Sequence, residues 1–267
     1  MKISGLLGGS LLVVGAALLG GAADGEAVSG AEGYLAGAPL DLIAVLPPAP
    51  AAGSARDKAD RQIFRDTRRL EGTPRWDLAV GDVKLDPSSM LRAFSCAVGV
   101  RLTEETAPRT AQLLRRAQAD VREAISVPKE HYKRKRPFLA DKGAVCQSRD
   151  ELAKSFDYPS GHTSWGWAVA LLLAEADAVN APAILERGRA YGESRIVCGA
   201  HNASAVEAGR ITAASVVAAL HGNAEFRDDI AAARGELKAL RRGGGAPDAA
   251  ACVAEKTLLG EPLLSSY

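Results

Sequence analysis

The sequence has few of the residues that build metal sites. It contains four cysteines, and none of them forms a Cys-x-x-Cys pair. The histidines His162 and His201 have no Asp or Glu at the spacing of metal ligands. Both absences argue against a zinc site. The charges almost cancel, to a formal net charge of +1, so a general nucleic-acid-binding surface is not indicated. No stretch alternates polar and apolar residues for long enough to indicate a β-sheet, and no internal repeat is visible.

The first residues have the pattern of a secretory signal peptide, which we place at residues 1–23. Lys2 precedes the apolar run Leu6–Leu19, and small residues at 21–23 stand before Asp24. A membrane anchor is the alternative, but the run is rich in Gly and Ala and its exit side is acidic. We therefore predict a periplasmic or secreted protein, with no further segment that spans a membrane.

The rest of the chain predicts one all-α domain, a helical bundle around a buried central helix. Residues 24–55 contain a Gly/Ala/Ser-rich stretch and the stiff Leu46–Pro50, so we expect an extended segment lying along the body. Residues 56–267 then form the domain, and Ser160–Ala178, apolar almost all round, is its buried helix. The other expected helices are Ala59–Leu70, one opened by Asp86-Pro87, Ala111–Ile125, Ser148–Lys154, one from Pro182 to about Cys198, Ser204–His221 and Asn223–Arg242.

Two boundaries in this scheme bear on later structure. Val127-Pro128 is expected to end the helix before it, which puts Lys129 on a loop or in a new first turn. The segment from Ala246 onward is expected to be a loosely held tail, unless a bond at Cys252 pins it. The proline argument thus separates Lys129 from the long helix that precedes it.

An even number of cysteines behind a signal peptide indicates two disulfides. Three pairings are possible, and we favour Cys96–Cys146 with Cys198–Cys252. The alternative is four buried free thiols.

The stretch from Tyr158 to Arg210 contains the features that point to chemistry. Pro159-Ser160-Gly161-His162 stands where the buried helix begins, so backbone N–H groups and the positive end of the helix dipole favour an anion there. His201 follows Ser194-Arg195 at the far end of the stretch. Two imidazoles in one pocket can divide a reaction, one attacking and the other protonating the leaving group.

Three cations complete this candidate site. Lys129 supplies a point charge, and Arg136 and Arg195 supply two planar forks for phosphate oxygens. Runs of basic residues are usually solvated, and the neighbouring residues Lys133 to Lys135 are assigned to solvent.

The spacing of these residues resembles a known three-part signature. Lys129 is separated by six residues from Arg136-Pro137. Pro159 to His162 follows, and then Ser194-Arg195, which five residues separate from His201. This resembles the type 2 phosphatidic acid phosphatase superfamily, which includes the vanadium haloperoxidases. Within it the chain resembles the bacterial class A non-specific acid phosphatases.

The resemblance implies metal-independent hydrolysis of small phosphate monoesters at acidic pH, with no cofactor and with inorganic phosphate as product. His201 would form a phosphohistidine, and His162 would protonate the leaving alcohol and then activate water. The phosphate would be held by Lys129, Arg136, Ser160, Gly161 and Arg195. The resemblance leaves a homo-oligomer open.

One position departs from the family pattern. The third motif ends in Asp four residues after its His, and here that position is Ala205. Glu207 is six residues from His201 and is expected to point elsewhere on a helix. Because the missing carboxylate orients the nucleophile, a second interpretation is a phosphate-binding protein or trapped variant with little turnover. A vanadate-dependent peroxidase shares the site and is a third, disfavoured interpretation.

Overall fold

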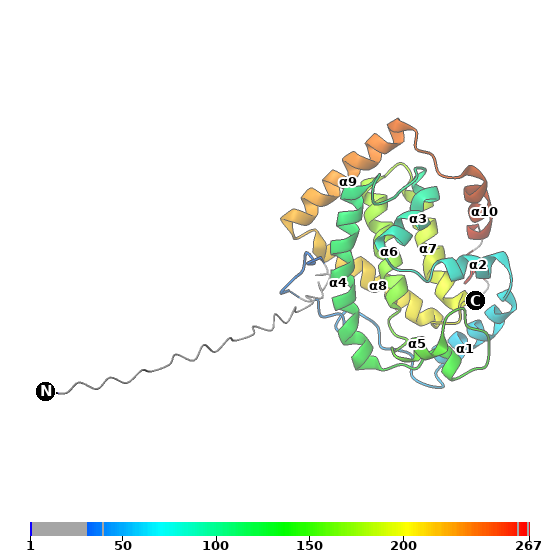
Figure 1. Cartoon of the computed structure of the whole chain (residues 1–267). Helices are drawn as coiled ribbons and strands as arrows, with labels where there is room; N and C mark the ends of the chain where they lie inside the picture. Colours follow the sequence, from blue (N-terminus) through cyan, green and yellow to red (C-terminus); the bar gives the residue numbers. More distant parts are fainter. Residues whose placement is uncertain (2–30, 39, 261, 266) are drawn as a thin grey trace.

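The computed structural model describes residue 1 and residues 31–38, 40–260, 262–265 and 267. Apart from Met1, the predicted signal peptide lies outside the described residues. The all-α prediction is confirmed, since helices and no strand occur in these ranges (Figure 1). The helices are α1 (Ala55–Thr67), α2 (Pro74–Gly81), α3 (Pro87–Val98), α4 (Pro108–Tyr132), α5 (Arg149–Ala153), α6 (Gly161–Ala176), α7 (Ala181–Val197), α8 (Ala203–Leu220), α9 (Ala224–Gly243) and α10 (Ala249–Leu259), with short 3₁₀ turns η1 (Arg68–Leu70) and η2 (Pro137–Leu139).

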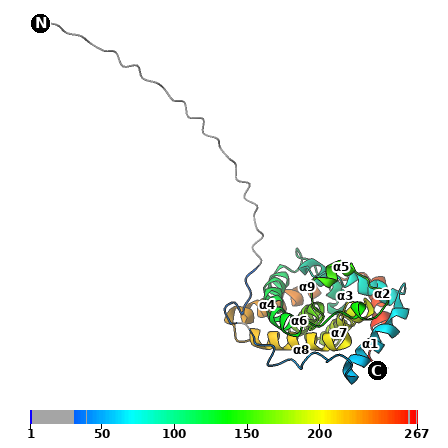
Figure 2. The same ribbon diagram turned by 90° about the horizontal axis from the view of Figure 1, so that it is seen from below.

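Helix α6 is the buried central helix that the sequence predicted. It packs against α7 and α8 along most of its length and also contacts α4, α9 and α3 (Figure 2). Glycines permit this close packing, because a Cβ at Gly166 would lie 2.2 Å from the Tyr191 ring and one at Gly188 would lie 2.3 Å from Ala170 Cβ. These contacts hold α6 tightly against α7 inside the bundle.

Helix α3 begins as its sequence predicts. The Asp86 side chain accepts a hydrogen bond from Ser89 N at 2.9 Å, and Pro87 occupies the first turn. Gly99 ends the helix in the left-handed region at φ 76°. The segment between α2 and α3 contacts the N-terminal end of α6, because Val83 O lies 3.0 Å from His162 Nε2.

The expected end of α4 at Val127-Pro128 is wrong. The helix continues through Pro128 and ends after Tyr132, where Lys133 adopts φ 45°. Val121, Ala124 and Pro128 are all buried at helical spacing, so packing continues across the proline. The proline removes one i→i−4 hydrogen bond but leaves the apolar stripe intact. Lys129 therefore lies on the last turn of α4 and not on a loop.

The favoured disulfide pairing is also wrong. The structure has Cys96–Cys252 and Cys146–Cys198, and no free cysteine occurs in the described ranges. The segment expected to be a loose tail forms α10, which packs on α2 and α7 and brings Cys252 to α3 (Figure 1). Cys146 lies beside the end of α7, where its N–H donates to Cys198 O at 3.0 Å.

Helix α8 is long and apolar enough to cross a membrane by length and composition, a property that sequence reasoning missed. In the fold it is a core helix, largely buried, and it packs on α6, α4, α7 and α1. Before α1, described residues from 31 onward pack Tyr34, Leu42 and Leu46 into the main core. Asp120 on α4 accepts the Tyr34 N–H at 2.9 Å, which ties this segment to the bundle.

Candidate active site

A cavity of about 310 Å³ opens at the N-terminal end of α6. Five of the residues singled out in the sequence line it: Lys129, Arg136, Gly161, His162 and His201. They come from the last turn of α4, the start of η2, the first turn of α6 and the turn between α7 and α8. The fold thus brings together residues that are up to 72 positions apart, from Lys129 to His201. Ser160 and Arg195 do not line this cavity directly.

His201 is held in one orientation and one tautomer. Its Nδ1 lies 2.8 Å from Asp157 O and 3.0 Å from Asp157 Oδ1. Both partners accept hydrogen bonds, so Nδ1 carries the proton. Arg136 Nη1 lies 3.0 Å from Nε2 and can only donate, so Nε2 carries the lone pair. This places an unprotonated ring nitrogen beside a guanidinium at the cavity.

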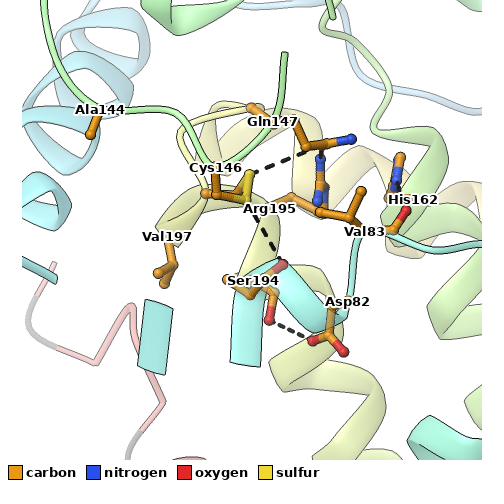
Figure 3. Close-up of a disulfide and its surroundings, with 12 residues drawn as sticks. Asp82, Val83, Ala144, Cys146, Gln147, His162, Ser194, Arg195 and Val197 are labelled. Atoms are coloured by element: carbon orange, nitrogen blue, oxygen red, sulfur yellow. Dashed lines mark hydrogen bonds between the residues drawn. A yellow bond between two sulfur atoms is a disulfide. The ribbon is translucent and has the colours of Figure 1, made fainter. Parts of the chain in front are cut away.

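His162 lies in the first turn of α6 and is tied to the segment after α2. Its Nε2 lies 3.0 Å from Val83 O (Figure 3), and because a carbonyl only accepts, Nε2 is the donor. Nδ1 is then the ring nitrogen that can exchange a proton with a bound molecule. The two histidines therefore present opposite atoms to the cavity, Nε2 of His201 and Nδ1 of His162.

The surroundings of both imidazoles favour the neutral ring over the charged one. Burial and then the charges of Arg195 and His201 hold the pKa of His162 well below its usual range. Burial and then Arg136 and Lys129 do the same for the pKa of His201. The contact between His201 and Asp157 is therefore a hydrogen bond to a neutral ring, and it becomes an ion pair as well when the ring is charged.

Three cations surround the rings. Lys129 Nζ donates to Phe156 O, and burial followed by the charge of Arg136 lowers its pKa to about 7. Arg136 Nε donates to Ser155 O at 2.8 Å. Arg195 Nη2 donates to Gln147 Oε1 (Figure 3), and Gln147 lines the cavity.

Arg195 has donors that are not used. Its side chain is fully buried, yet Nε and Nη1 have no hydrogen-bond partner among the described residues. Burial lowers its pKa to about 10, so the guanidinium stays charged at neutral and acidic pH. A buried cation with two free N–H groups is costly unless an anion meets it. This favours an oxyanion ligand.

The start of α6 adds backbone donors. The Ser160 side chain caps the helix, accepting from Thr163 N at 3.3 Å and from Thr163 Oγ1 at 2.9 Å. A Cβ at Gly161 would lie 2.8 Å from Ile125 Cδ1, so a side chain there would displace the wall of the cavity. Glycine leaves the N-terminal amide groups of α6 open to an anion.

Sequence reasoning missed two residues, Asp157 and Gln147. Asp157 is fully buried and contacts the His201 ring, although it lies upstream of the second motif. The family pattern places the carboxylate downstream at position 205, where this chain has the buried methyl group of Ala205 on α8, and Glu207 pairs instead with Arg56 near the surface. An acidic residue immediately before Tyr158-Pro159 was the available signal.

Comparison with known proteins agrees with this geometry. A model of the PAP2 superfamily matches residues 120–227, a range that contains every site residue named above. An acid phosphatase of Zymomonas mobilis is 42% identical over 219 residues, covering 81% of this chain and 83% of the relative. The chain belongs to the PAP2 superfamily.

Further relatives narrow this membership. A non-specific acid phosphatase of Providencia stuartii is 39% identical over 206 residues, which is 76% of this chain and 83% of the relative. One of Salmonella typhimurium is 34% identical over 195 residues, 72% of this chain and 78% of the relative. Within the PAP2 superfamily the chain is therefore an enzyme of the acid phosphatase group.

Proposed function

We propose that this enzyme is a secreted, metal-independent acid phosphatase that hydrolyses phosphate monoesters through a phosphohistidine on His201. The observation that carries the proposal is the His201 ring itself. Its Nε2 lone pair faces a cavity lined by Lys129 and Arg136, with Arg195 bonded to the lining residue Gln147, while Nδ1 is held by Asp157. A neutral nucleophile among fixed cations suits attack on a phosphorus atom that carries negative oxygens.

In the first step, His201 Nε2 attacks phosphorus and the bond to the leaving oxygen breaks. Arg195 Nε and Nη1, Arg136, Lys129 and the Gly161 N–H stabilise the three equatorial oxygens, over which charge spreads in the transition state. His162 starts this step as the imidazolium, protonated at Nδ1 as well as Nε2, gives the Nδ1 proton to the leaving alcohol and becomes neutral. The products of this step are the free alcohol and a phosphoryl group bonded to Nε2.

In the second step, water attacks the phosphohistidine. His162, now neutral, accepts a proton from that water at Nδ1, and the bond between phosphorus and Nε2 breaks. The electron pair of the broken bond returns to His201 Nε2. Inorganic phosphate leaves, His201 is neutral again and His162 is protonated again. No step requires a metal, because the cations of the site neutralise the phosphoryl oxygens.

The pKa shifts favour an acidic optimum. His162 must be protonated to act as the acid, and its lowered pKa means that this form is lost as pH rises through an acidic range. His201 must be neutral to attack, and its lowered pKa keeps it neutral as pH falls. Both shifts move the active window to lower pH.

The cavity wall next to these groups favours an apolar leaving group. Leu85, Val121, Ile125 and Trp165 line it beside the phosphate-binding residues. Aryl phosphates therefore fit the site. The two disulfides support a periplasmic or secreted location, where such bonds persist.

The test is p-nitrophenyl phosphate hydrolysis across pH, with and without EDTA, for the wild type and His201→Ala. We expect an acidic optimum, no loss in EDTA and a fall in turnover on the order of 10⁴-fold or more in the variant. Rapid acid-free quenching should trap a phosphohistidine in the wild type. Strong inhibition by EDTA, or an active His201→Ala enzyme, would remove the proposal. Phosphate binding without hydrolysis would instead identify the binding-protein alternative raised by Ala205.

A further inference from the structure

We propose that Asp157 is the positioning residue of His201, supplying from the segment before α6 the carboxylate that Ala205 does not supply from α8. This inference rests on the proposed role of His201 as nucleophile. In this chain the orienting carboxylate stands at position 157 and not at position 205, 48 residues away. The nucleophilic ring keeps a carboxylate partner, but from a different element of the fold.

The contacts of Asp157 fix one oxygen against the ring. Oδ1 lies 3.0 Å from His201 Nδ1 and accepts the Asn202 N–H at 3.1 Å. Oδ2 accepts from Asn202 Nδ2 at 2.8 Å and lies 3.5 Å from Arg134 Nη1. Donors approach both oxygens, so the group is held as an acceptor and cannot swing away from the imidazole.

Position 205 explains why the chain needs this arrangement. Ala205 lies in the first turn of α8, three residues after the cap Asn202, and it is fully buried. Side chains in a helix lean toward its N-terminus, so a carboxylate at 205 would be directed back toward Asn202 and His201. Ala205 has only a methyl group there, and Asp157, from the segment before α6, contacts the same ring.

The carboxylate acts mainly when the ring becomes charged. Phosphorylation of Nε2 while Nδ1 keeps its proton makes the ring cationic, and an adjacent carboxylate stabilises that charge. The Asp157 main-chain carbonyl also accepts from Nδ1, at 2.8 Å, and remains in any side-chain variant. The tautomer is therefore partly preserved without the carboxylate, and the charge stabilisation is what is lost.

Burial raises the pKa of Asp157, and the neighbouring Arg134 and the donors of Asn202 oppose that shift. A matched control exists in the same network. Asp60 on α1 is also buried, also binds Arg134 (2.9 Å) and accepts the Ser204 N–H (2.9 Å). Its hydrogen bonds, unlike those of Asp157, do not include the His201 ring.

The experiment compares Asp157→Asn with Asp60→Asn for kcat, KM and inhibition by inorganic phosphate, and uses circular dichroism to check folding. We expect kcat to fall about 100-fold in Asp157→Asn, less than the roughly 10⁴-fold loss in a serine protease because the main-chain acceptor remains. KM and the phosphate inhibition constant should stay within about threefold, and Asp60→Asn should keep kcat within about threefold. Equal kcat losses in the two variants would overturn the proposal.

A relocation variant keeps the test decisive if Asp157→Asn folds poorly. Asp157→Ala should lose kcat, and Asp157→Ala with Ala205→Asp should recover at least about tenfold of it, since a carboxylate again meets the ring. A double variant no better than Asp157→Ala would show that the two positions do not serve the same ring. His201→Ala and phosphoenzyme trapping run alongside. A wild type that forms phosphohistidine while Asp157→Asn keeps full kcat refutes this inference and leaves the proposed function standing.

Discussion

Two carboxylates near the active site, those of Asp157 and Asp82, are buried, and each pairs with an arginine. Asp157 contacts the His201 ring, whereas Asp82 pairs with Arg187 and accepts the Ser194 hydroxyl at 2.7 Å (Figure 3). Asp82 thereby binds two side chains of α7, and the next residue, Val83, contacts His162. Burial and charge are similar in the two networks, and contact with an imidazole that changes charge is what distinguishes them. A buried ion pair is by itself weak evidence of catalysis.

The comparison is tested most strongly by removing one arginine beside the catalytic histidines, Arg195, and one from the Asp82 network, Arg187. Arg195→Ala removes the two unpartnered donors near the cavity, and we expect kcat/KM to fall on the order of 10³-fold, with weaker inhibition by phosphate. Steady-state kinetics with p-nitrophenyl phosphate and a phosphate titration measure both. Thermal unfolding should change little, because the variant removes a poorly satisfied buried cation. A variant that keeps kcat/KM within tenfold would exclude Arg195 from phosphate binding.

Removing Arg187 from the other network should affect stability more than catalysis. Arg187→Met leaves Asp82 buried without its partner, and breaking such a pair costs about 3–5 kcal/mol of unfolding free energy. Urea denaturation measures this loss, and kcat below the transition should stay within about threefold. A large kcat loss in a fully folded Arg187→Met protein would mean that the Asp82 network also takes part in the chemistry.

The pH dependence of phosphate binding gives a smaller effect. Lys129 has its pKa lowered to about 7, so its charge is present at acidic pH and is lost as pH rises through that value. We expect phosphate inhibition to weaken by about tenfold between pH 6 and pH 9 beyond the ionisation of phosphate itself. Lys129→Arg keeps its charge and serves as the reference, because both enzymes meet the same ligand. Parallel profiles for the two enzymes would contradict a titrating Lys129.

The smallest effect is expected from Ala205→Asp in the wild-type background. Asp157 already occupies one side of the His201 ring, so a second carboxylate should raise kcat by less than about threefold and crowd a buried site with like charge. The assay is kcat at the acidic optimum, with unfolding followed in parallel. A gain of orders of magnitude would mean that the natural enzyme lacks an effective orienting group.

Local sequence signals predicted much of the fold. Asp86-Pro87 marked the start of α3, and the apolar run after Ser160 marked the buried helix. Signals that depend on packing were misread. Pro128 normally ends a helix, yet burial of Ala124 and Pro128 carries α4 one turn further. The disulfide pairing depended on α10 folding back to α3, which no local pattern shows.

In the candidate site, too, the residues in local motifs were predictable and a residue placed by packing was not. Residue spacing singled out Lys129, Arg136, His162 and His201, because their motifs are short and ordered. Asp157 belongs to no motif and acquires its place only when the segment before α6 meets the turn after α7. The acidic residue before Tyr158-Pro159 is visible in the sequence, but its role follows only from the fold, because Asp157 and His201 are neighbours in space and not in sequence.

The Cys96–Cys252 bond has a consequence for resistance to proteolysis. It closes a covalent ring across a sequence separation of 156 residues, and Lys129, Asp157, Arg195 and His201 all lie within it. A single cut by an environmental protease in any surface loop of that ring leaves the two fragments joined. An enzyme with this architecture can be nicked and still hold its whole active site in one molecule.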